Sequence, residues 1–253
     1  MAKLVTQDLT KIFPPRRAGT DAVTALDHVN FEVDGGTFVS LVGPSGCGKT
    51  TFLNIVSQVE TPTAGKVEIE SNGSGSSRIG YVFQDPRLLP WRTVLDNILY
   101  VLDDGTKQER VALAEKHLAA VGLAHAADMY PGQLSGGMQQ RIGIARAMCI
   151  DPGVLLMDEP FSHLDAVTAR GLREQVQQLW QATGATVLFV THDVMEAVLL
   201  SNRVLMMRPG GVLHADIPVD LPYPRNQTDP AVALKQAEII EIFEAMERAS
   251  VAA

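Results

Sequence analysis

The sequence is poor in several features that mark common classes of protein. Its 253 residues include only two cysteines, Cys47 and Cys149, which are too few for a disulfide framework and fit a reducing compartment. The longest apolar runs, such as 187–190 and 197–200, are far shorter than the roughly 20 residues that span a bilayer. No continuous apolar segment follows the first Lys and Arg residues, so no signal peptide is predicted. We therefore expect a cytosolic chain in which any membrane role requires a partner chain.

The sequence also lacks an excess of positive charge. A net charge of -8 and an isoelectric point near 5.2 argue against a general nucleic-acid surface, because binding a phosphate backbone requires a basic face. Hydrophobic residues make up 46% and charged residues 20%, which is ordinary for a globular protein. The length permits one large domain or a main domain with a small appendage.

Short apolar runs and helical patterns follow one another along the chain. We predict strands at Lys3–Leu9, Val23–Val33, Thr37–Val42, Val154–Asp158 and Thr186–Thr191, and helices at Thr106–Val121, Gly136–Cys149 and Asp165–Thr183. A stretch rich in Ser and Gly, Ser71–Ser77, is expected to be a surface turn. The alternation of strands with helices predicts an α/β fold with a mostly parallel sheet.

A glycine-rich motif lies between the strand-like run Phe38–Val42 and the helical run Thr51–Ser57. It matches the phosphate-loop pattern at every fixed position and comprises Gly43, Pro44, Ser45, Gly46, Cys47, Gly48, Lys49 and Thr50. The glycines let backbone N–H groups turn toward phosphates, and the start of the helix adds its positive end. By composition, the bare pattern arises by chance in about one chain of this length in a hundred. We therefore predict that the loop, together with Thr51, binds ATP.

Three side chains of this loop have expected roles. Lys49 would reach the β- and γ-phosphates, and the Thr50 hydroxyl would ligate Mg²⁺. Cys47 stands near a helix start, where thiolate formation is favoured and alkylation should block ATP binding. The alternative for Cys47 is a small residue tolerated at a variable loop position.

Two later strands also end in polar side chains. The apolar run Val154–Asp158 ends in a carboxylate and is followed by Glu159, and the run 186–190 is followed by Thr191 and His192. A buried strand that ends in acids is common, but ligands gather at the carboxyl ends of parallel strands. We predict that Asp158 holds Mg²⁺ through water, that Glu159 accepts a proton from the attacking water, and that His192 contacts the γ-phosphate.

The segment Leu134–Arg141 lies between these pieces and resembles the signature of the ATP-binding subunits of ABC transporters. That signature is a Ser-Gly-Gly helix start followed by Gln, and it is matched by Ser135, Gly136, Gly137, Gln139 and Gln140, with Met138 where many members have Gln. Ser135 would cap a helix whose free N–H groups form a second phosphate site. In the family this site, formed by Ser135, Gly136, Gly137 and Gln139, serves the ATP of a partner subunit. The resemblance therefore implies a head-to-tail homodimer.

Other landmarks of this family follow in the expected order, and the resemblance covers nearly all of Lys3–Pro209. Gln84 matches the family glutamine that touches Mg²⁺ or the attacking water, and Ser162–Asp165 matches a loop at the dimer interface in which His163 replaces a smaller residue. Phe13 stands where the family stacks an aromatic ring on adenine, although a core Phe is the alternative.

The resemblance also implies an architecture. We expect an ABC cassette of the P-loop NTPase type over residues 1–210, with a mostly parallel sheet core, an antiparallel β part and a helical subdomain at about 86–150. Residues 211–253 would form a C-terminal extension. In this extension Ile239, Ile242, Phe243 and Met246 make an apolar stripe at helical spacing. We expect this helix to pack on its own domain, with a regulatory or dimer contact as the alternative.

Other functional classes lack support in the sequence. A DNA-repair or chromosome-organising ATPase needs a long coiled coil between the two nucleotide motifs, and no sustained heptads occur between Lys49 and Asp158. A translation-factor ATPase carries two cassettes, an exporter usually has fused membrane helices, and a nonhydrolysing switch would lack Glu159. An exporter, a lipid- or protein-release system, or a soluble ABC ATPase remains as the alternative to an importer.

A narrower resemblance is to the importer ATPases of the nitrate, sulfonate and taurine group. It is carried by Leu41–Lys49, Val82–Trp91 and Asn97, while Gln58 replaces a usual Gly, so a different helix end is expected there. It implies Mg-ATP as the energy source, a separate membrane permease, an indirect role for an extracytoplasmic solute-binding protein, and a peripheral location at the cytoplasmic face of the membrane. It does not name the solute.

An apolar run directly after Gln84 has a separate interpretation. Leu88, Leu89, Pro90 and Trp91 are interrupted by Pro residues that break helix and strand periods, so we predict a loop. Exposed apolar loops mark docking surfaces, and Trp is enriched among interface anchors. The loop is therefore predicted to contact the permease; the alternative is that Trp91 folds back onto the helical region that follows.

Overall fold

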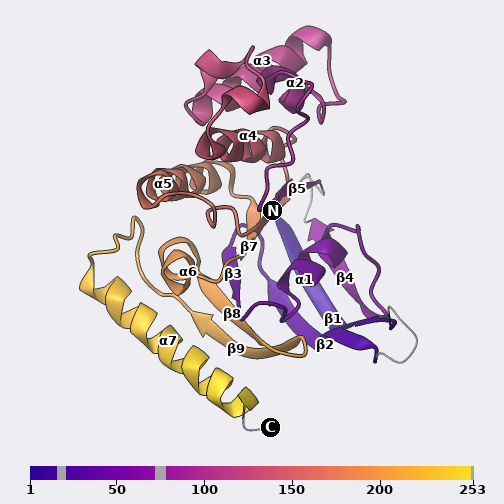
Figure 1. The fold of residues 1–253 in the computed structure, drawn as a ribbon, viewed down its shortest axis with the longest axis vertical. Coiled ribbons are helices and arrows are strands. Elements are labelled where there is room, and N and C mark those ends of the chain that lie inside the picture. The colour runs from indigo at the N-terminus through magenta and orange to yellow at the C-terminus, as the bar shows by residue number, and fades with distance from the viewer. Residues whose placement is uncertain (16–20, 72–77, 252–253) are drawn as a thin grey trace. The chain divides into compact units, whose positions relative to one another are not determined.

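The computed structural model describes residues 1–15, 21–71 and 78–251. The turn expected at 71–77 therefore lies outside the described residues, apart from Ser71. The chain forms two compact units, one made of residues 1–75 with 186–253 and the other of residues 76–185 (Figure 1). Among the described residues, no helix is both long and apolar enough to cross a membrane.

The first unit begins with a three-stranded antiparallel sheet. It contains β1 (Ala2–Phe13), β2 (Val23–Val33) and β4 (Ala64–Ser71) in the order β2-β1-β4. Inward-facing residues of β1 and β2 are buried, whereas alternate residues of β2 face solvent, which is the pattern of a sheet with one covered face. This sheet confirms the expected antiparallel part.

A second set of strands in the first unit carries the glycine-rich loop. The strand β3 (Phe38–Val42) pairs in parallel with β7 (Thr186–Val190) and with β8 (Arg203–Arg208). The strand β9 (Val212–Pro218) adds to β8 in the antiparallel sense. Every residue of β3 and β7 is buried, as expected for central parallel strands. The helices α1 (Lys49–Val56) and α6 (Val194–Leu200) follow β3 and β7 directly.

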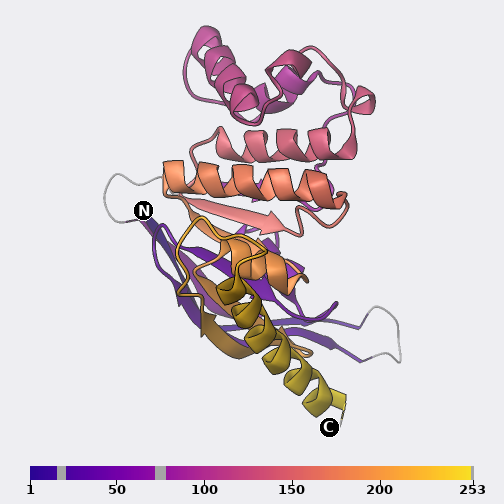
Figure 2. The same cartoon turned by 90° about the vertical axis from the view of Figure 1, so that its left-hand side faces the viewer.

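The C-terminal helix α7 (Pro230–Val251) packs on the first unit, as the helical spacing predicts (Figures 1 and 2). Ile239 and Met246 are buried in a cluster with residues of β8 and α6, and Ile242 and Phe243 pack against this cluster. The apolar stripe is therefore covered by the helix's own unit. Acidic residues on the exposed side of the helix remain in water.

The second unit contains two parallel strands and most of the helices. Its elements are β5 (Ile79–Val82), α2 (Val94–Leu99), α3 (Lys107–Ala120), short 3₁₀ turns at Ala124–Ala126 and Pro131–Gln133, α4 (Gly136–Met148), β6 (Val154–Asp158) and α5 (Ala166–Thr183). In both views α4 lies between α5 on one side and α2 with α3 on the other (Figures 1 and 2).

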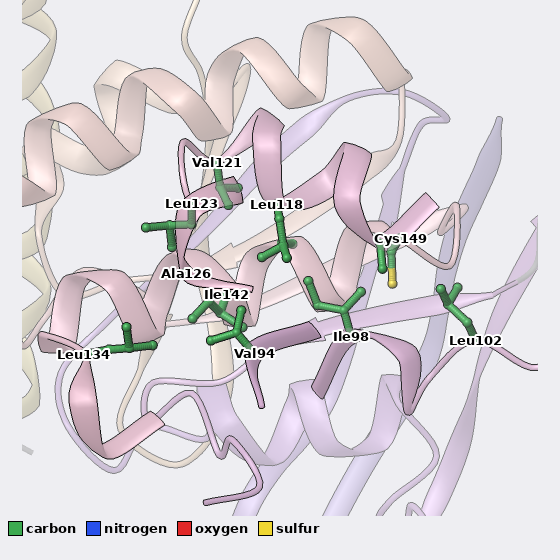
Figure 3. Packing of buried hydrophobic residues seen from close by; sticks show 12 residues of the cluster. Val94, Ile98, Leu102, Leu118, Val121, Leu123, Ala126, Leu134, Ile142 and Cys149 are labelled. Carbon is green, nitrogen blue, oxygen red and sulfur yellow. The ribbon is translucent and has the colours of Figure 1, made fainter. Parts of the chain in front are cut away.

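The helices of the second unit enclose a core of their own. Val94 and Ile98 of α2, Leu118 of α3, and Ile142 and Cys149 of the α4 region point into one buried cluster (Figure 3). Burying one such side chain contributes about 1.5–3 kcal/mol. Cys149, which ends the predicted helix 136–149, is a core residue, because it is only 3% exposed within this cluster.

The predicted elements agree with the structure to within a few residues at their ends. One detail differs at the end of α1, where a different helix end was expected because Gln58 replaces Gly. Gln58 instead adopts the left-handed conformation that Gly favours, with φ 62°. The N–H groups of Ser57 and Gln58 donate to the carbonyls of Leu53 and Ile55, so the helix closes as it would with Gly.

Candidate functional site

The glycine-rich loop is shaped by backbone contacts that leave no room for side chains. A Cβ on Gly43 would lie 2.5 Å from the carbonyl oxygen of Met207, and one on Gly48 would lie 2.1 Å from that of Ala25. Gly46 and Gly48 also have φ angles of 78° and 102°, which L residues rarely adopt. These glycines are thus required for the close, curved path of the chain. A Cβ on Gly46 would meet nothing within 4 Å, so the loop is open on that side.

The loop also gathers positive charge. The Lys49 side chain is 7% exposed, and its ammonium donates to the carbonyl oxygens of Gly43 at 2.7 Å and Pro44 at 3.0 Å. Among the described residues, no side chain caps the first turn of α1, which begins at Lys49. A buried ammonium beside an uncapped helix start suits a phosphate group, since both favour negative charge. Ser45 and Thr50 are exposed on this loop, and Thr51 follows in α1.

The protein side chains fit a Mg²⁺ ion that comes with a phosphate ligand. In the part of the chain that the structure describes, no group of three or more His, Cys, Asp or Glu side chains could hold a metal ion alone. Mg²⁺ is usually held by one or two protein oxygens together with phosphate oxygens and water. The Thr50 hydroxyl in the first unit and the half-buried Asp158 carboxylate in the second are each an oxygen of this kind.

The expectation of a favoured thiolate at Cys47 is wrong. The Cys47 side chain is 1% exposed, and burial raises its pKa even though the Lys49 ammonium, 3.9 Å from the sulfur, acts in the opposite direction. Desolvation therefore outweighs the nearby positive charge. Cys47 is therefore a packed thiol whose ionisation is disfavoured. This agrees with the alternative of a small residue accommodated by the loop.

Two more predicted site residues lie in the first unit. His192 is exposed on the turn from β7 to α6, next to Asp193, whose carboxylate caps α6 by accepting the N–H of Met195 at 2.7 Å. Phe13 ends β1 and is half-buried, with the Lys11 ammonium 4.8 Å from the centre of its ring. Phe13 is thus not a fully buried core residue, and one part of its ring remains accessible.

In the second unit, the predicted acids stand at the end of β6. Asp158 is the last residue of the strand, and Glu159 follows with a φ of 44°, a strained conformation for a residue with a Cβ. Tyr81 of β5 lies on the same face of this strand pair as Asp158. Burial, and then the charge of Asp158, raises the pKa of Tyr81, so the phenol stays a donor at neutral pH. The sequence reasoning missed Tyr81.

Gln84 and Glu159 are linked through one hydroxyl. The Gln84 side-chain amide donates to the Ser162 Oγ at 3.2 Å, and this hydroxyl donates to the Glu159 carbonyl oxygen at 3.0 Å. The chain Gln84–Ser162–Glu159 therefore connects two predicted catalytic residues that are remote in sequence. Ser162 was assigned only to a loop motif, and nothing in its local sequence indicates that it bridges these two residues.

The predicted second phosphate site begins α4 in the expected way. The Ser135 Oγ accepts the N–H of Met138 at 3.3 Å, which confirms the predicted N-cap. Gly137 packs against α5, since a Cβ there would lie 2.5 Å from the Thr168 side chain. Gln139 donates to the carbonyl oxygens of Pro131 and Leu134, so its side chain holds the preceding turn in place.

Near this helix start lies a cavity of about 200 Å³. Its lining comes from the turn after β5, the start of α4 and the loop after β6, and consists of Gln84, Asp85, Pro86, Gly136, Gln139, Gln140, Pro160, His163 and Leu164. Asp165, at the end of that loop, caps α5 by accepting the N–H groups of Val167 and Thr168. Hydrogen bonds from Thr168 lower the pKa of Asp165 and hold its carboxylate on the helix.

The predicted apolar loop is exposed at only part of its length. Trp91 is 72% exposed, so the alternative in which it folds back onto the next helix is wrong. Leu88 packs against the helical core, and Leu89 is half-buried, so the apolar run is less exposed than expected. The fully buried Asn97 of α2 holds this loop through hydrogen bonds to the backbone of Leu89, Arg92 and Thr93.

Comparison with known proteins agrees with these features. Residues 26–162 match the family described as ABC transporter. The chain is 44% identical over 248 residues to an uncharacterized ABC transporter ATP-binding protein of Methanocaldococcus jannaschii, covering 95% of this chain and 91% of the relative. It is 40% identical over 229 residues to the aliphatic sulfonates import ATP-binding protein of Bacillus thuringiensis subsp. konkukian, covering 89% of this chain and 90% of the relative.

A solved structure shows the same fold. This is the dimeric structure of a post-hydrolysis state of an ATP-binding cassette bound to ADP and Pi, with 31% sequence identity and a TM-score of 0.75. The match covers 87% of this chain and all of the other. The family match spans more than half of the residues and includes the phosphate-loop and signature motifs. This chain therefore belongs to the ABC transporter family.

Proposed function

We propose that this chain is the ATP-binding and ATP-hydrolysing subunit of an importer that moves a small solute through a separate permease. The observation that carries the proposal is the structure of the loop Gly43–Thr50. The buried Lys49 ammonium lies beside the uncapped start of α1, and the backbone has no room for a Cβ at Gly43 or Gly48. The import function in the name of the Bacillus relative supports the direction of transport. A nitrate-, sulfonate- or taurine-like solute fits the resemblance of the segment 82–91.

The residues have distinct roles in this proposal. The backbone of residues 43–51 and the Lys49 ammonium bind the phosphates, Phe13 stacks on the adenine, and the Thr50 hydroxyl and Asp158 carboxylate hold Mg²⁺. When bound, Mg²⁺ neutralises charge that develops on the β- and γ-phosphates. Glu159 accepts a proton from the attacking water, while Gln84 orients that water and His192 contacts the γ-phosphate.

The start of α4 serves a second copy of the chain in this proposal. Ser135, Gly136, Gly137 and Gln139 would face the ATP held by the partner subunit, and Asp165 would lie at the same interface. The dimeric cassette found among solved structures supports such a pairing. The dimer would bind at the cytoplasmic face of the membrane through the permease, and an extracytoplasmic solute-binding protein would act indirectly.

The segment from Gln84 to Trp91 is the proposed contact with the permease. Trp91 projects from a loop whose backbone is held by the buried Asn97, so the indole is presented on a fixed base. Gln84, at the other end of this segment, is linked through Ser162 to the Glu159 peptide. Docking there would therefore be sensed at the hydrolytic site.

The docking proposal is tested with a double variant, Trp91→Ala with Leu89→Ala. Copurification with the permease and solute-stimulated ATPase activity should weaken, while ATP binding by the isolated subunit persists. Leu234→Ala, which removes another exposed apolar side chain, from α7, is the matched control and should change neither. Intact assembly and stimulation in the folded double variant would exclude this surface.

The hydrolytic proposal is tested with Glu159→Gln. The variant keeps the size of the side chain but removes the base, so Mg-ATP binding should persist while ATP turnover drops by about 100-fold or more. ATP should then trap a dimer, which size-exclusion chromatography detects. Glu174→Gln is the control, since Glu174 is an exposed residue of α5 whose carboxylate forms an ion pair with Arg170, one turn earlier on the same helix.

Each outcome has a clear meaning. Wild-type turnover by Glu159→Gln in the presence of the permease would refute the assignment of the base. Failure of the unaltered chain to bind Mg-ATP would refute the proposed function as a whole. Mass spectrometry of the solute that copurifies with the permease and solute-binding protein would name the transported solute, and an outward-directed flux in vesicles would replace the importer with an exporter.

A further inference from the structure

The pairing of β5 with β6 brings one aromatic side chain onto the same face as a predicted Mg²⁺ ligand. Tyr81 lies opposite Leu156 in this parallel pair, and side chains along a strand alternate between faces. Asp158, two residues beyond Leu156, therefore shares the face of Tyr81. Burial, and then the charge of the Asp158 carboxylate and a hydrogen bond with it, raise the pKa of Tyr81, so the hydroxyl lies beside that carboxylate.

The Tyr81 ring is held in place by a stack. It lies against the Phe83 ring with 4.2 Å between the ring centroids and 20° between the planes. The Arg87 guanidinium lies over the Phe83 ring, 4.4 Å from its centre. Aromatic stacking and cation–π contacts of this kind each contribute orientation as well as attraction. The phenol therefore has little freedom to turn away from Asp158.

The far end of the stack is anchored to α4. Arg87 has a φ of 48°, and its carbonyl oxygen accepts a hydrogen bond from Arg146 at 3.1 Å. The other terminal nitrogen of Arg146 donates to the Pro86 carbonyl oxygen at 2.6 Å. A strained backbone conformation persists only where surrounding contacts hold it, and the two hydrogen bonds from Arg146 hold the backbone at Arg87. The series Asp158, Tyr81, Phe83 and Arg87 is thus continuous up to the loop that carries Trp91.

We propose that Tyr81 is a positioning residue that holds the Asp158 carboxylate in the orientation that serves Mg²⁺, and that its stack on Phe83 ties this orientation to the segment 84–91. The inference rests on the proposed function, in which Asp158 helps to hold Mg²⁺. A carboxylate that serves a metal needs a partner that orients it, and the loss of such a partner typically lowers metal affinity or activity by about 10- to 100-fold. Tyr81 supplies this partner from the neighbouring strand.

A purely structural role for Tyr81 makes a different prediction. The ring packs on Phe83, and Phe in its place would keep the ring and this stack while removing only the hydroxyl. If Tyr81 merely packs, Tyr81→Phe should leave every ligand equilibrium unchanged. If the hydroxyl orients Asp158, the variant should lose Mg²⁺-dependent binding while binding of ATP without the metal stays intact.

The experiment measures ATP affinity of the full chain in two buffers, one with saturating Mg²⁺ and one with a chelator. The Glu159→Gln background prevents turnover, so the readout is equilibrium binding and not activity. We expect Tyr81→Phe to reduce the Mg²⁺-dependent gain in ATP affinity about 10-fold and to leave metal-free affinity within about twofold of the unaltered chain. In the hydrolysing chain, the Mg²⁺ concentration for half-maximal turnover should rise by a similar factor.

Two further variants separate the possible causes. Tyr223→Phe is the matched control, because Tyr223 is another half-buried tyrosine whose hydroxyl donates to a carbonyl oxygen, that of Leu200, at 2.8 Å. It should not alter Mg²⁺-dependent binding. In an Asp158→Asn background, Tyr81→Phe should have no additional effect, because the hydroxyl acts through the carboxylate. Thermal unfolding confirms that each variant is folded.

The outcomes distinguish this inference from the proposed function. An unchanged Mg²⁺-dependent gain in folded Tyr81→Phe would overturn the inference and leave the ATPase proposal standing. Equal losses with and without Mg²⁺, or an undiminished effect of Tyr81→Phe in the Asp158→Asn background, would also overturn it. If the unaltered chain binds no Mg-ATP, the proposed function fails, and the role of Tyr81 fails with it.

Discussion

The buried Asn97 offers the most direct test of how the exposed loop before α2 is held. Its side-chain oxygen accepts the N–H of Leu89 at 2.7 Å, and its amide donates to the carbonyl oxygens of Leu89, Arg92 and Thr93 at 3.2, 3.3 and 2.9 Å. Asn97→Ala removes all of these bonds. At roughly 0.5–1.5 kcal/mol net for each bond, the loss is about 2–6 kcal/mol. Water can reach the loop and form some of the lost hydrogen bonds in place of the amide, so we expect a local destabilisation of about 3 kcal/mol.

Limited proteolysis measures this effect where it occurs. Trypsin cleaves after Arg87, which precedes the tethered residues, and after Arg92, which is one of them. The cleavage rate follows the open population when opening is fast. A local loss of about 3 kcal/mol corresponds to a roughly 100-fold rise in that population. Asn226→Ala is the control, since Asn226 is exposed and its side-chain oxygen accepts the N–H and the hydroxyl of the nearby Thr228. This change should cost less than about 0.5 kcal/mol.

A second variant at the same position adds a pH dependence. Asn97→Asp keeps the acceptor for Leu89 but places a buried carboxylate beside three carbonyl oxygens, so the folded state should raise the pKa of the new group. A raised folded pKa means that stability is greatest below the unfolded value and is lost as the pH rises through the folded one. Cleavage by a protease active in acid should therefore be slow and become faster toward neutral pH. An unchanged cleavage rate in Asn97→Ala would refute the tether.

Three further predictions follow from other parts of the structure. Because burial raises the pKa of Cys47, its alkylation at pH 8 should be slower than that of free glutathione and should accelerate as the pH rises toward the raised pKa. In denaturant this protection should be lost. An alkylation rate above that of glutathione, measured by mass spectrometry, would contradict the prediction. Gln58→Gly should raise the free energy of unfolding by roughly 0.5–1 kcal/mol. Gly removes the strain of the left-handed backbone, and this gain exceeds the cost of the greater freedom of the unfolded chain. A urea midpoint that does not increase would argue against strain at this position. Arg225→Lys should lower the free energy of unfolding by about 2 kcal/mol in the same assay. A lysine lacks the planar guanidinium that donates to the carbonyl oxygens of Val198, Ser201 and Leu221. Equal stability of the two proteins would show that the guanidinium is dispensable.

Much of the fold could be predicted because its signals are local. The strand at 23–33 was predicted with the bounds that the structure has, since its turn residues and alternation lie within a few positions of one another. The N-cap at Ser135 was predicted for the same reason, because a cap depends on the three residues that follow it. The apolar stripe of α7 likewise indicates its buried side without knowledge of what covers it.

Errors arose where the outcome depends on the environment of a side chain. Proximity to a helix start favours a thiolate, but the burial of Cys47 by surrounding residues has the larger effect on its pKa. Leu88 and Leu89 follow a break in periodicity that predicts an exposed run, yet Leu88 packs on the helical core. Composition and spacing carry no information on how much water reaches a particular atom.

The sequence by itself determined that a phosphate loop, two acids after an apolar strand and a capped signature helix occur in one chain. These motifs are recognisable because their chemistry requires particular residues at fixed short spacings. Only the tertiary structure decided which residues support them. Tyr81 shares a face with Asp158, and Gln84 reaches Glu159 through Ser162, because strand pairing and loop folding bring together residues that are far apart in the sequence. A hydrogen bond needs its two atoms within about 3 Å, and for remote residues that distance depends on the packing of the whole unit.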